Sequence, residues 1–299
     1  MEDNKYQKVI ADSKVATDDA KVKAEVEAIL AAHTAENDNK DVYKLMFNCI
    51  DLTTLGTDDS ERSVAAFTQR VNDFENNYAE FPNVAAICVY SKFAEVVRET
   101  LEASDVNIAV CSANFPSSQA RLEVKTVETA LAVADGADEV DIVFPVSYFI
   151  DGAYEEIADE IAEIKQSARH GDTEAHLKVI LETGLLKSAE NIKIASILSM
   201  YSGADFIKTS TGKIYAGATP EAAYVMCQCI KEYYEKCGRM VGFKASGGVR
   251  TTADALKYYT IVKEVLGEKW LCKDYFRIGA SSLANNLFAD ITGEDVKPF

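Results

Sequence analysis

A strand-like segment followed by a helix-like segment, repeated eight times, is the feature of this sequence that most restricts its fold. The strand-like segments are short, apolar and rich in β-branched or aromatic residues: Leu45–Ile50, Val84–Tyr90, Asn107–Ala113, Glu139–Phe144, Leu177–Leu181, Asp205–Thr209, Met240–Ala245 and Phe276–Gly279. The segments between them have the length and apolar spacing of helices, for example Ser91–Leu101, Arg121–Ala134, Tyr154–Arg169, Ala189–Tyr201, Pro220–Lys236 and Thr252–Leu266. Such alternation is typical of parallel βαβ units. Eight units in roughly 245 residues predict a single closed (β/α)8 TIM barrel of the α/β class, with an open doubly wound sheet as the alternative.

The first 42 residues differ from this pattern, because they are charged and contain no strand-like run. One helical face collects apolar residues at i, i+4, i+7 and i+8: Val22, Val26, Ile29 and Leu30. Thr17, followed by Asp18 and Asp19, predicts an N-cap and an acidic first turn. We therefore expect a helical N-terminal extension, residues 1–42, that packs on or caps a barrel domain, residues 43–299, with a short C-terminal tail.

Composition narrows the range of functions. The chain carries 31 Lys and Arg against 48 Asp and Glu, a formal charge of −17, which argues against a broad nucleic-acid or anionic-membrane surface. No apolar run approaches the roughly 18 residues of a transmembrane helix, and the opening Met1-Glu2-Asp3 is unlike a signal peptide. The seven cysteines include no CxxC pair, and His33, His170 and His176 are not spaced as a metal cluster. We expect a reducing, cytoplasmic location and neither a metal nor another cofactor.

Charged residues interrupt the predicted strands. Successive strand residues point to opposite sides, so four charged residues can face the barrel interior while their apolar neighbours face the helices: Asp141, Lys178, Lys208 and Lys244. Lys208 and Lys244 belong to adjacent predicted strands, and two ammonium groups in a partly desolvated cavity repel, which lowers the pKa of at least one. A neutral amine near pH 7 is a nucleophile, and Asp141 can transfer protons directly or through water. For Lys178 we expect an ion pair with a carboxylate such as Glu182 or Asp141.

The loops after the last two predicted strands indicate a phosphate site. Gly247 and Gly248 follow the seventh strand, and the segment Gly279–Ser282, which ends in Ser281 and Ser282, follows the eighth. Glycines let backbone N–H groups converge on an anion, and serines at a helix start add hydroxyl donors. These loops are the usual phosphate site of a (β/α)8 barrel. Further residues suited to complete the site are Thr211, Gly212, Lys213 and Arg250.

Nine motifs, in order over about residues 44–290, resemble the 2-deoxyribose-5-phosphate aldolase family. They are DLTTL (Asp51–Leu55), AAICVY (Ala85–Tyr90), NFP (Asn114–Pro116), GADEVDIVFP (Gly136–Pro145), LKVILETG (Leu177–Gly184), GADFIKTSTGK (Gly203–Lys213), ATPE (Ala218–Glu221), GFKASGGVRT (Gly242–Thr251) and GASSL (Gly279–Leu283). The resemblance implies a metal-independent lyase of deoxyribonucleotide catabolism. Its reaction would be the reversible cleavage of 2-deoxy-D-ribose 5-phosphate to D-glyceraldehyde 3-phosphate and acetaldehyde through a lysine Schiff base. It also implies a homodimer.

The resemblance also assigns roles to individual residues. It makes Lys208 the Schiff-base lysine, Lys244 the lysine that perturbs it, and Asp141 a member of the proton relay. Asp51 and Thr53 match positions that line the sugar end of the pocket. Other matched positions are the pocket cysteine, Cys88, and the phosphate-binding residues Gly212, Gly247, Gly248, Ser281 and Ser282.

The chain departs from the family pattern at three places. Ala245 stands where members often have the proline of FKPAGG, which we expect to alter stiffness more than chemistry. The NFP motif continues as Ser117-Ser118 instead of His-Gly, so the contacts of that loop are expected to differ. Several members end in a proton-shuttling tyrosine, whereas this chain ends in Phe299, whose phenyl ring can close over the pocket but cannot exchange a proton.

Three other functions remain open from the sequence. One is another Schiff-base phosphosugar aldolase, such as a transaldolase-like enzyme. The second is a non-catalytic phosphosugar-binding barrel, which the joint presence of Lys208, Lys244 and Asp141 disfavours. The third is a metal-dependent aldolase, which the small supply of histidines disfavours.

Overall fold

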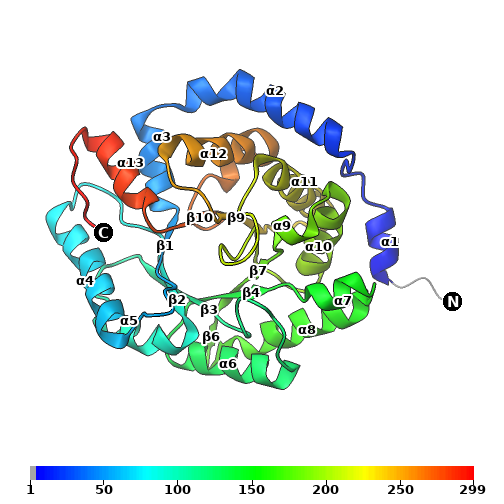
Figure 1. The fold of residues 1–299 in the computed structure, drawn as a ribbon, viewed down its shortest axis with the longest axis horizontal. Coiled ribbons are helices and arrows are strands. Elements are labelled where there is room, and N and C mark those ends of the chain that lie inside the picture. The colour runs from blue at the N-terminus through cyan, green and yellow to red at the C-terminus, as the bar shows by residue number, and fades with distance from the viewer. Residues whose placement is uncertain (1–4) are drawn as a thin grey trace.

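Parallel strands close into a barrel that is surrounded by helices, as the computed structural model of the chain shows (Figure 1). The structure describes residues 5–299; the opening Met1-Glu2-Asp3, interpreted above as unlike a signal peptide, lies outside the described residues. Within that range the barrel has eight strands in the closed order β1-β10-β9-β8-β7-β4-β3-β2. A closed parallel barrel confirms the predicted (β/α)8 fold and excludes the open sheet. In the described part of the chain, no helix has the length and apolar character needed to cross a membrane.

The barrel strands are short, and each pairs with the next barrel strand along the chain. Their bounds are β1 Ile50–Thr53, β2 Ala86–Tyr90, β3 Asn107–Cys111, β4 Glu139–Val143, β7 His176–Ile180, β8 Phe206–Lys208, β9 Gly242–Ser246 and β10 Phe276–Ala280. The remaining strands, β5 Arg169–His170 and β6 Thr173–Glu174, form a small antiparallel hairpin before β7. This hairpin begins where the sequence predicted the end of a helix.

A helix of 7 to 18 residues follows each barrel strand, and further helices lie before the barrel and in several loops. The helices that follow the strands are α4 Glu61–Asn77, α5 Ala94–Thr100, α6 Leu122–Ala134, α8 Tyr154–Ser167, α10 Ala189–Tyr201, α11 Pro220–Cys237, α12 Thr252–Leu266 and α13 Leu283–Thr292. The others are α1 Lys5–Ala11, α2 Asp19–Asn37, α3 Lys40–Asn48, α7 Val146–Ile150, α9 Thr183–Leu186 and the 3₁₀ helices η1 Ser91–Phe93 and η2 Glu268–Trp270.

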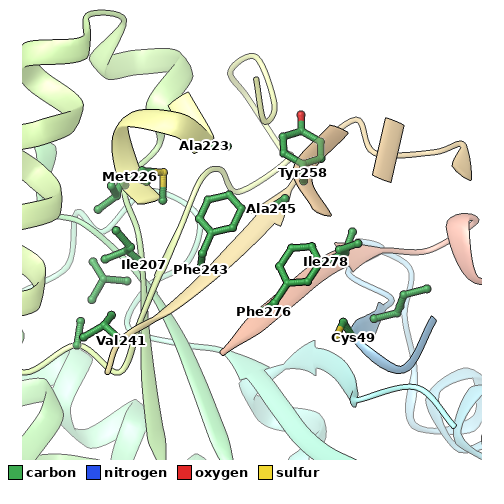
Figure 2. Packing of buried hydrophobic residues seen from close by; sticks show 14 of the residues in the cluster. Cys49, Ile207, Ala223, Met226, Val241, Phe243, Ala245, Tyr258, Phe276 and Ile278 are labelled. Atoms are coloured by element: carbon green, nitrogen blue, oxygen red, sulfur yellow. The ribbon is translucent and has the colours of Figure 1, made fainter. Parts of the chain in front are cut away.

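Alternation along β9 and β10 separates the apolar layer from the charged interior. Phe243 and Phe276 are register partners, and their rings stack with centroids 6.5 Å apart beneath the helices (Figure 2). The next register pair, Lys244 and Arg277, faces the barrel interior, where both side chains are fully buried. The period-two alternation of a strand therefore buries hydrophobic side chains on one side and directs the charges to the other.

The first predicted strand was displaced. The run Leu45–Ile50 was expected to be extended, but α3 continues through Asn48 and β1 begins at Ile50. The side chain of Asn39 caps α3 by accepting the backbone N–H groups of Asp41 and Val42, and the helix buries Phe47. An apolar run of this length fits a buried helix as well as a strand, and here the cap upstream favours the helix.

The N-terminal helices lie on the outside of the barrel (Figure 1). Helix α2 crosses α12 and α11, with Val22 and Val26 buried against them. Its N-cap is Asp18, which accepts the N–H of Lys21 at 3.0 Å, and not Thr17 as predicted. At its other end, Asn37 donates to the Thr260 hydroxyl at 3.2 Å. These contacts tie α2 to the helical ring.

The C-terminal ring of Phe299 packs in the helical layer and not over the mouth of the barrel. Its centroid lies 6.1 Å from that of Phe47 and 5.2 Å from that of Phe74. The side chain of Asn285 holds its backbone, donating to the Phe299 oxygen at 2.9 Å and accepting its N–H at 3.0 Å. The expectation that this ring closes over the pocket is therefore wrong, because the ring packs, partly buried, on an aromatic cluster between α3, α4 and α13.

Candidate active site

A cavity of about 270 Å³ opens at the carboxyl ends of β1, β8, β9 and β10. Its lining residues come from the ends of these strands and the loops that follow: Thr53, Leu55, Lys208, Thr211, Gly212, Lys213, Ser246, Gly247, Gly248, Val249, Arg250, Gly279, Ala280, Ser281 and Ser282. Most of the site residues that the sequence suggested therefore surround one cavity. Asp51, Cys88, Asp141 and Lys244 are not part of its lining; they are fully buried in the barrel interior.

Lys208 and Lys244 converge on one carboxylate in the barrel interior. The Nζ atom of Lys208 donates to Oδ2 of Asp141 at 2.8 Å, and that of Lys244 donates to the same oxygen at 2.7 Å. The two nitrogens can therefore be no further apart than the sum of these distances. The register explains this proximity, because Lys208 on β8 pairs directly with Lys244 on β9. Only Lys208 of the two reaches the cavity.

Lys178 occupies the other side of the same carboxylate. It donates to Oδ1 of Asp141 at 3.0 Å and also makes an ion pair with Glu139. Glu182, which the sequence analysis considered as its partner, instead accepts the Thr211 hydroxyl at 2.5 Å. Lys178 is thus paired with Asp141, as expected, and also with Glu139, whereas the alternative partner Glu182 is not used.

Arg277 and Glu139 complete the buried network, and sequence reasoning did not single out either of them. Arg277 donates to Oδ1 of Asp51 at 2.6 Å and to Oε1 of Glu139 at 2.7 Å. Asp51 also makes an ion pair with Lys244. Both residues could have been found from the sequence. Glu139 is two positions before Asp141 in the same strand, so the two side chains point to the same side, and Arg277 is a charged residue within an otherwise apolar strand.

The buried network contains more cationic than anionic side chains. Among the residues that the structure describes, it joins three carboxylates (Asp51, Glu139 and Asp141) to four cationic side chains (Lys178, Lys208, Lys244 and Arg277). With every group ionised, the network carries one excess positive charge in a buried space. Loss of one proton from a lysine would make it neutral.

Electrostatics keep Asp141 ionised and Lys244 protonated. Burial alone would raise the pKa of Asp141, but Lys178, Lys208 and Lys244 together hold the pKa of this carboxyl well below its usual range. Burial alone would lower the pKa of Lys244, but the carboxylates of Asp141 and Asp51 raise it well above the ordinary lysine value. The pKa of Lys178 is raised for the same reason, by Asp141 and Glu139 against the effect of burial.

Close backbone packing shapes the side of the cavity that the glycine loops form. Gly247 has φ +86°, and a Cβ atom there would lie 2.9 Å from the Cα of Gly217. A Cβ atom on Gly217 would lie only 2.1 Å from the carbonyl oxygen of Gly247. Two loops thus meet backbone to backbone, which only glycine permits. Glu182 supports the same region, because it accepts both the N–H and the hydroxyl of Thr211.

Polar donors surround the mouth of the cavity. Ser282 precedes α13 without capping it through its side chain, so its hydroxyl is not committed to that helix. Lys213 donates to the carbonyl oxygen of Leu55 and lies 5.8 Å from the ring centroid of Tyr90. Arg250 is exposed and also lines the cavity. Backbone N–H groups, hydroxyls and cations in such a loop cluster suit a phosphate.

The fold and the site together define a (β/α)8-barrel enzyme with a lysine that lines a polar cavity at the carboxyl ends of the strands. A model of the DeoC/LacD family aldolases matches residues 45–285. The chain belongs to this aldolase family.

Relatives extend the comparison over most of the chain. A Caenorhabditis elegans protein provisionally named deoxyribose-phosphate aldolase is 42% identical over 83% of this chain and 81% of its own length. The human deoxyribose-phosphate aldolase is 37% identical over 92% of this chain and 89% of its own. The tetrameric deoxyribose phosphate aldolase structure from Aeropyrum pernix covers 89% of this chain and 98% of its own, with a TM-score of 0.66 and 24% identity, and so supports the fold.

Proposed function

We propose that this aldolase cleaves 2-deoxy-D-ribose 5-phosphate reversibly to D-glyceraldehyde 3-phosphate and acetaldehyde, through a Schiff base on Lys208, in deoxyribonucleotide catabolism. The names of the human and Caenorhabditis elegans relatives support the substrate. The assignment of Lys208 is carried by one observation. Lys208 is the lysine of the buried network that lines the cavity, while Lys178 and Lys244 are wholly enclosed.

The excess of one cationic side chain is compatible with one neutral amine in the network. Because the carboxylates raise the pKa of Lys178 and Lys244, those two side chains keep their protons. Four cationic side chains share three carboxylates, so one amine of the network can be neutral without leaving a carboxylate unpaired. An amine without its proton is the nucleophile that a carbonyl substrate requires.

The chemistry then follows from this amine. Lys208 adds to the aldehyde of the open-chain sugar, and loss of water gives a protonated imine. Cleavage of the bond between carbons 2 and 3 sends its electron pair to the imine nitrogen, while the proton of the carbon-3 hydroxyl leaves to a base. Glyceraldehyde 3-phosphate departs, the enamine takes a proton on its terminal carbon, and hydrolysis releases acetaldehyde and the free amine.

Asp141 is proposed to act in the proton relay as a fixed anion. Its pKa is held well below the usual range, so direct protonation of this carboxylate is unfavourable. A water oriented by Asp141 and protonated Lys244 fits this electrostatic setting better than proton storage on the carboxylate. The Asp141 carboxylate also stabilises positive charge as it develops on the imine nitrogen.

The glycine and serine loops are proposed to bind the phosphate of the substrate. Gly247 and Gly248 on one side, and Ser281 and Ser282 on the other, line the same cavity as Lys208. Binding the remote phosphate fixes the reacting carbons in position, so its binding energy contributes to the chemical step.

Reductive trapping tests the assignment. Borohydride with acetaldehyde should add one ethyl group per chain on the Lys208 peptide, and Lys208→Arg should abolish it. Lys213→Met is the matched control, because it removes a neighbouring cavity lysine and should leave the adduct in place. An adduct on Lys178 or Lys213 would overturn the proposal.

Faster cleavage of keto-sugar phosphates than of deoxyribose phosphate would favour a transaldolase-like enzyme, and absence of released acetaldehyde would favour a binding protein.

We further propose a division of the chain into a helical extension, residues 1–42, and a barrel domain, residues 43–299. The hydrogen bond of the Ala189 N–H to Asp19, at 2.8 Å, and the burial of Val22 support a capping role for the extension. The boundary falls inside α3. Removal of residues 1–36 should lower thermal stability and leave the trapped lysine unchanged if the extension only caps the barrel.

A homodimer and a cytoplasmic location complete the proposal. Val124, Val127 and Leu131 form an apolar stripe on α6 and are each more than half exposed, at 55%, 57% and 59%. A second copy of the chain would cover this stripe, and Leu131→Glu should shift a dimer to monomer in sedimentation velocity.

All seven cysteines, which lie within residues 5–299, are free, and this supports a reducing compartment. Cell fractionation tests the location.

A further inference from the structure

Two thiols and a carboxylate meet inside the barrel, beside the lysine network. Cys88 is on β2, Cys111 on β3 and Asp141 on β4, and Cys111 is the register partner of Asp141. One ligand atom from each, two sulfurs and a carboxylate oxygen, lie within 4.8 Å of one another. All three residues are buried. The barrel thus assembles a potential chelating group that spacing along the chain does not reveal.

The donor set suits a thiophilic divalent cation. Zinc–sulfur bonds of about 2.3 Å at the tetrahedral angle hold two sulfurs roughly 3.8 Å apart, and a carboxylate oxygen binds at about 2.0–2.2 Å. Cys88 pairs with Ala109, two residues before Cys111, so the cysteines are diagonal neighbours. A bridging ion fits this diagonal arrangement better than a direct disulfide, whose Cα separation is narrowly limited.

Charge does not oppose such an ion. Lys208 and Lys244 already make this region positive, and an added divalent cation would be unfavourable if nothing else changed. The ion, however, displaces the two thiol protons, so the total charge of the barrel interior stays the same.

Leu55 lines the cavity and also packs against the small cluster that contains Cys88 and Cys111. Leu55 is partly exposed, so rotation of its side chain would connect the mouth of the cavity to the sulfurs.

We propose that Cys88, Cys111 and Asp141 form an inhibitory site for a thiophilic divalent cation, Zn²⁺ or Cd²⁺. The bound ion takes Asp141 from Lys208 and Lys244, so the lysine pair loses its shared carboxylate and imine formation stops. The effect on activity rests on the proposed aldolase function, whereas binding of the ion does not. The site is not a cofactor site, because its occupation removes the carboxylate that the lysines share.

A cadmium titration of the full-length protein, free of added thiols, tests this inference. We expect one Cd²⁺ per chain, reported by the ultraviolet charge-transfer band of cadmium bound to thiolates, together with inhibition that a chelator reverses. Cys111→Ser should lose this band and raise the half-inhibitory Cd²⁺ concentration at least about tenfold. Cys237→Ser, which alters an exposed cysteine, is the matched control and should behave as the unmodified protein.

Several outcomes would overturn the inference. They are an unchanged band or unchanged sensitivity in Cys111→Ser, a loss of both in Cys237→Ser, and inhibition reversed by a reductant but not by a chelator. Cys111→Ala serves if the buried serine hydroxyl disturbs folding. If the protein bound cadmium at Cys111 but cleaved no aldol, the metal site would stand and the proposed reaction would fail.

Discussion

Lys208 and Lys244 donate to the same oxygen atom of Asp141, at 2.8 and 2.7 Å. One acceptor shared by two ammonium groups brings like charges close together, and only one of the two side chains lines the cavity. The pKa of the enclosed lysine, Lys244, is raised, because two carboxylates outweigh the effect of its burial. The consequence is a division of labour in which Lys244 holds a positive charge next to a lysine that the substrate can reach.

Removing the Asp141 charge should affect both chemistry and stability. Asp141→Asn leaves three lysines without their common anion, so we expect kcat to fall about 10²–10⁴-fold and the free energy of unfolding to fall by about 3–5 kcal/mol. Glu139→Gln is the control, because Glu139 pairs with Lys178 and Arg277 and makes no ion pair with Lys208. Glu139→Gln should lower the free energy of unfolding, but its loss of kcat should be much smaller than that of Asp141→Asn. Equal losses of kcat in both variants would contradict a specific role for Asp141.

The phosphate loops should act through substrate binding. In Gly247→Ala, the new Cβ meets the backbone of Gly217, so the loop must shift, and we expect KM for deoxyribose phosphate to rise at least about tenfold. Turnover of unphosphorylated deoxyribose should change little. Gly267→Ala has a similar backbone strain, with φ +87°, but no atom within 4 Å of the new Cβ, and it should leave KM unchanged. An equal effect of both variants would attribute the change to general destabilisation.

The terminal aromatic ring should contribute to stability and not to proton transfer. Phe299 packs on Phe47 and Phe74, so Phe299→Ala should lower the free energy of unfolding by about 2 kcal/mol, measured by urea denaturation. Phe299→Tyr should not accelerate exchange of the methyl protons of acetaldehyde with solvent. Faster exchange, followed by NMR in deuterated water, would show that the tail leaves its aromatic cluster and reaches the cavity.

Stability should depend on pH through the buried network, with opposite signs at the two extremes. The pKa of Asp141 is lowered on folding, so its contribution is complete above about pH 4 and is lost as pH falls through the native value. The pKa of Lys244 is raised, so its contribution is complete below about pH 10.4 and is lost as pH rises through the native value. The contribution of these two groups to the free energy of unfolding, measured with urea, should therefore be constant between about pH 5 and 9. Asp141→Asn should flatten the decline on the acid side.

Cys88 should react with unsaturated aldehydes. Its pKa is lowered to about 7 by the hydrogen bond with Cys111, against the effect of burial, so the thiolate fraction rises steeply around neutral pH. We expect acrolein to inactivate the enzyme faster at pH 8 than at pH 6, and peptide mapping should find the adduct on Cys88. Inactivation of Cys88→Ala at the unmodified rate would place the reaction elsewhere.

Several features of this protein could be predicted from the sequence because their causes are local. The alternation of strand-like and helix-like segments determined the barrel class, and the helix boundaries at Ala189–Tyr201 and Thr252–Leu266 agree with the prediction. The sequence also indicated which charged side chains face the barrel interior, because successive residues of a strand point to opposite sides. The motifs around Lys208 and Lys244 indicated the aldolase family, to which the chain belongs.

Other features were decided by the closure of the barrel. Arg277 on β10 meets Asp51 on β1, 226 positions apart in the chain, because the last strand pairs with the first. Which distant elements pack together also decides the partners of Lys178, the proximity of Cys88 to Cys111 and the packing of Phe299. Strand β1 begins later than predicted because the capped and partly buried helix α3 occupies the residues before it. Local pattern specifies the elements and their faces, whereas long-range register and packing decide which side chains share a proton, an oxygen atom or a buried site.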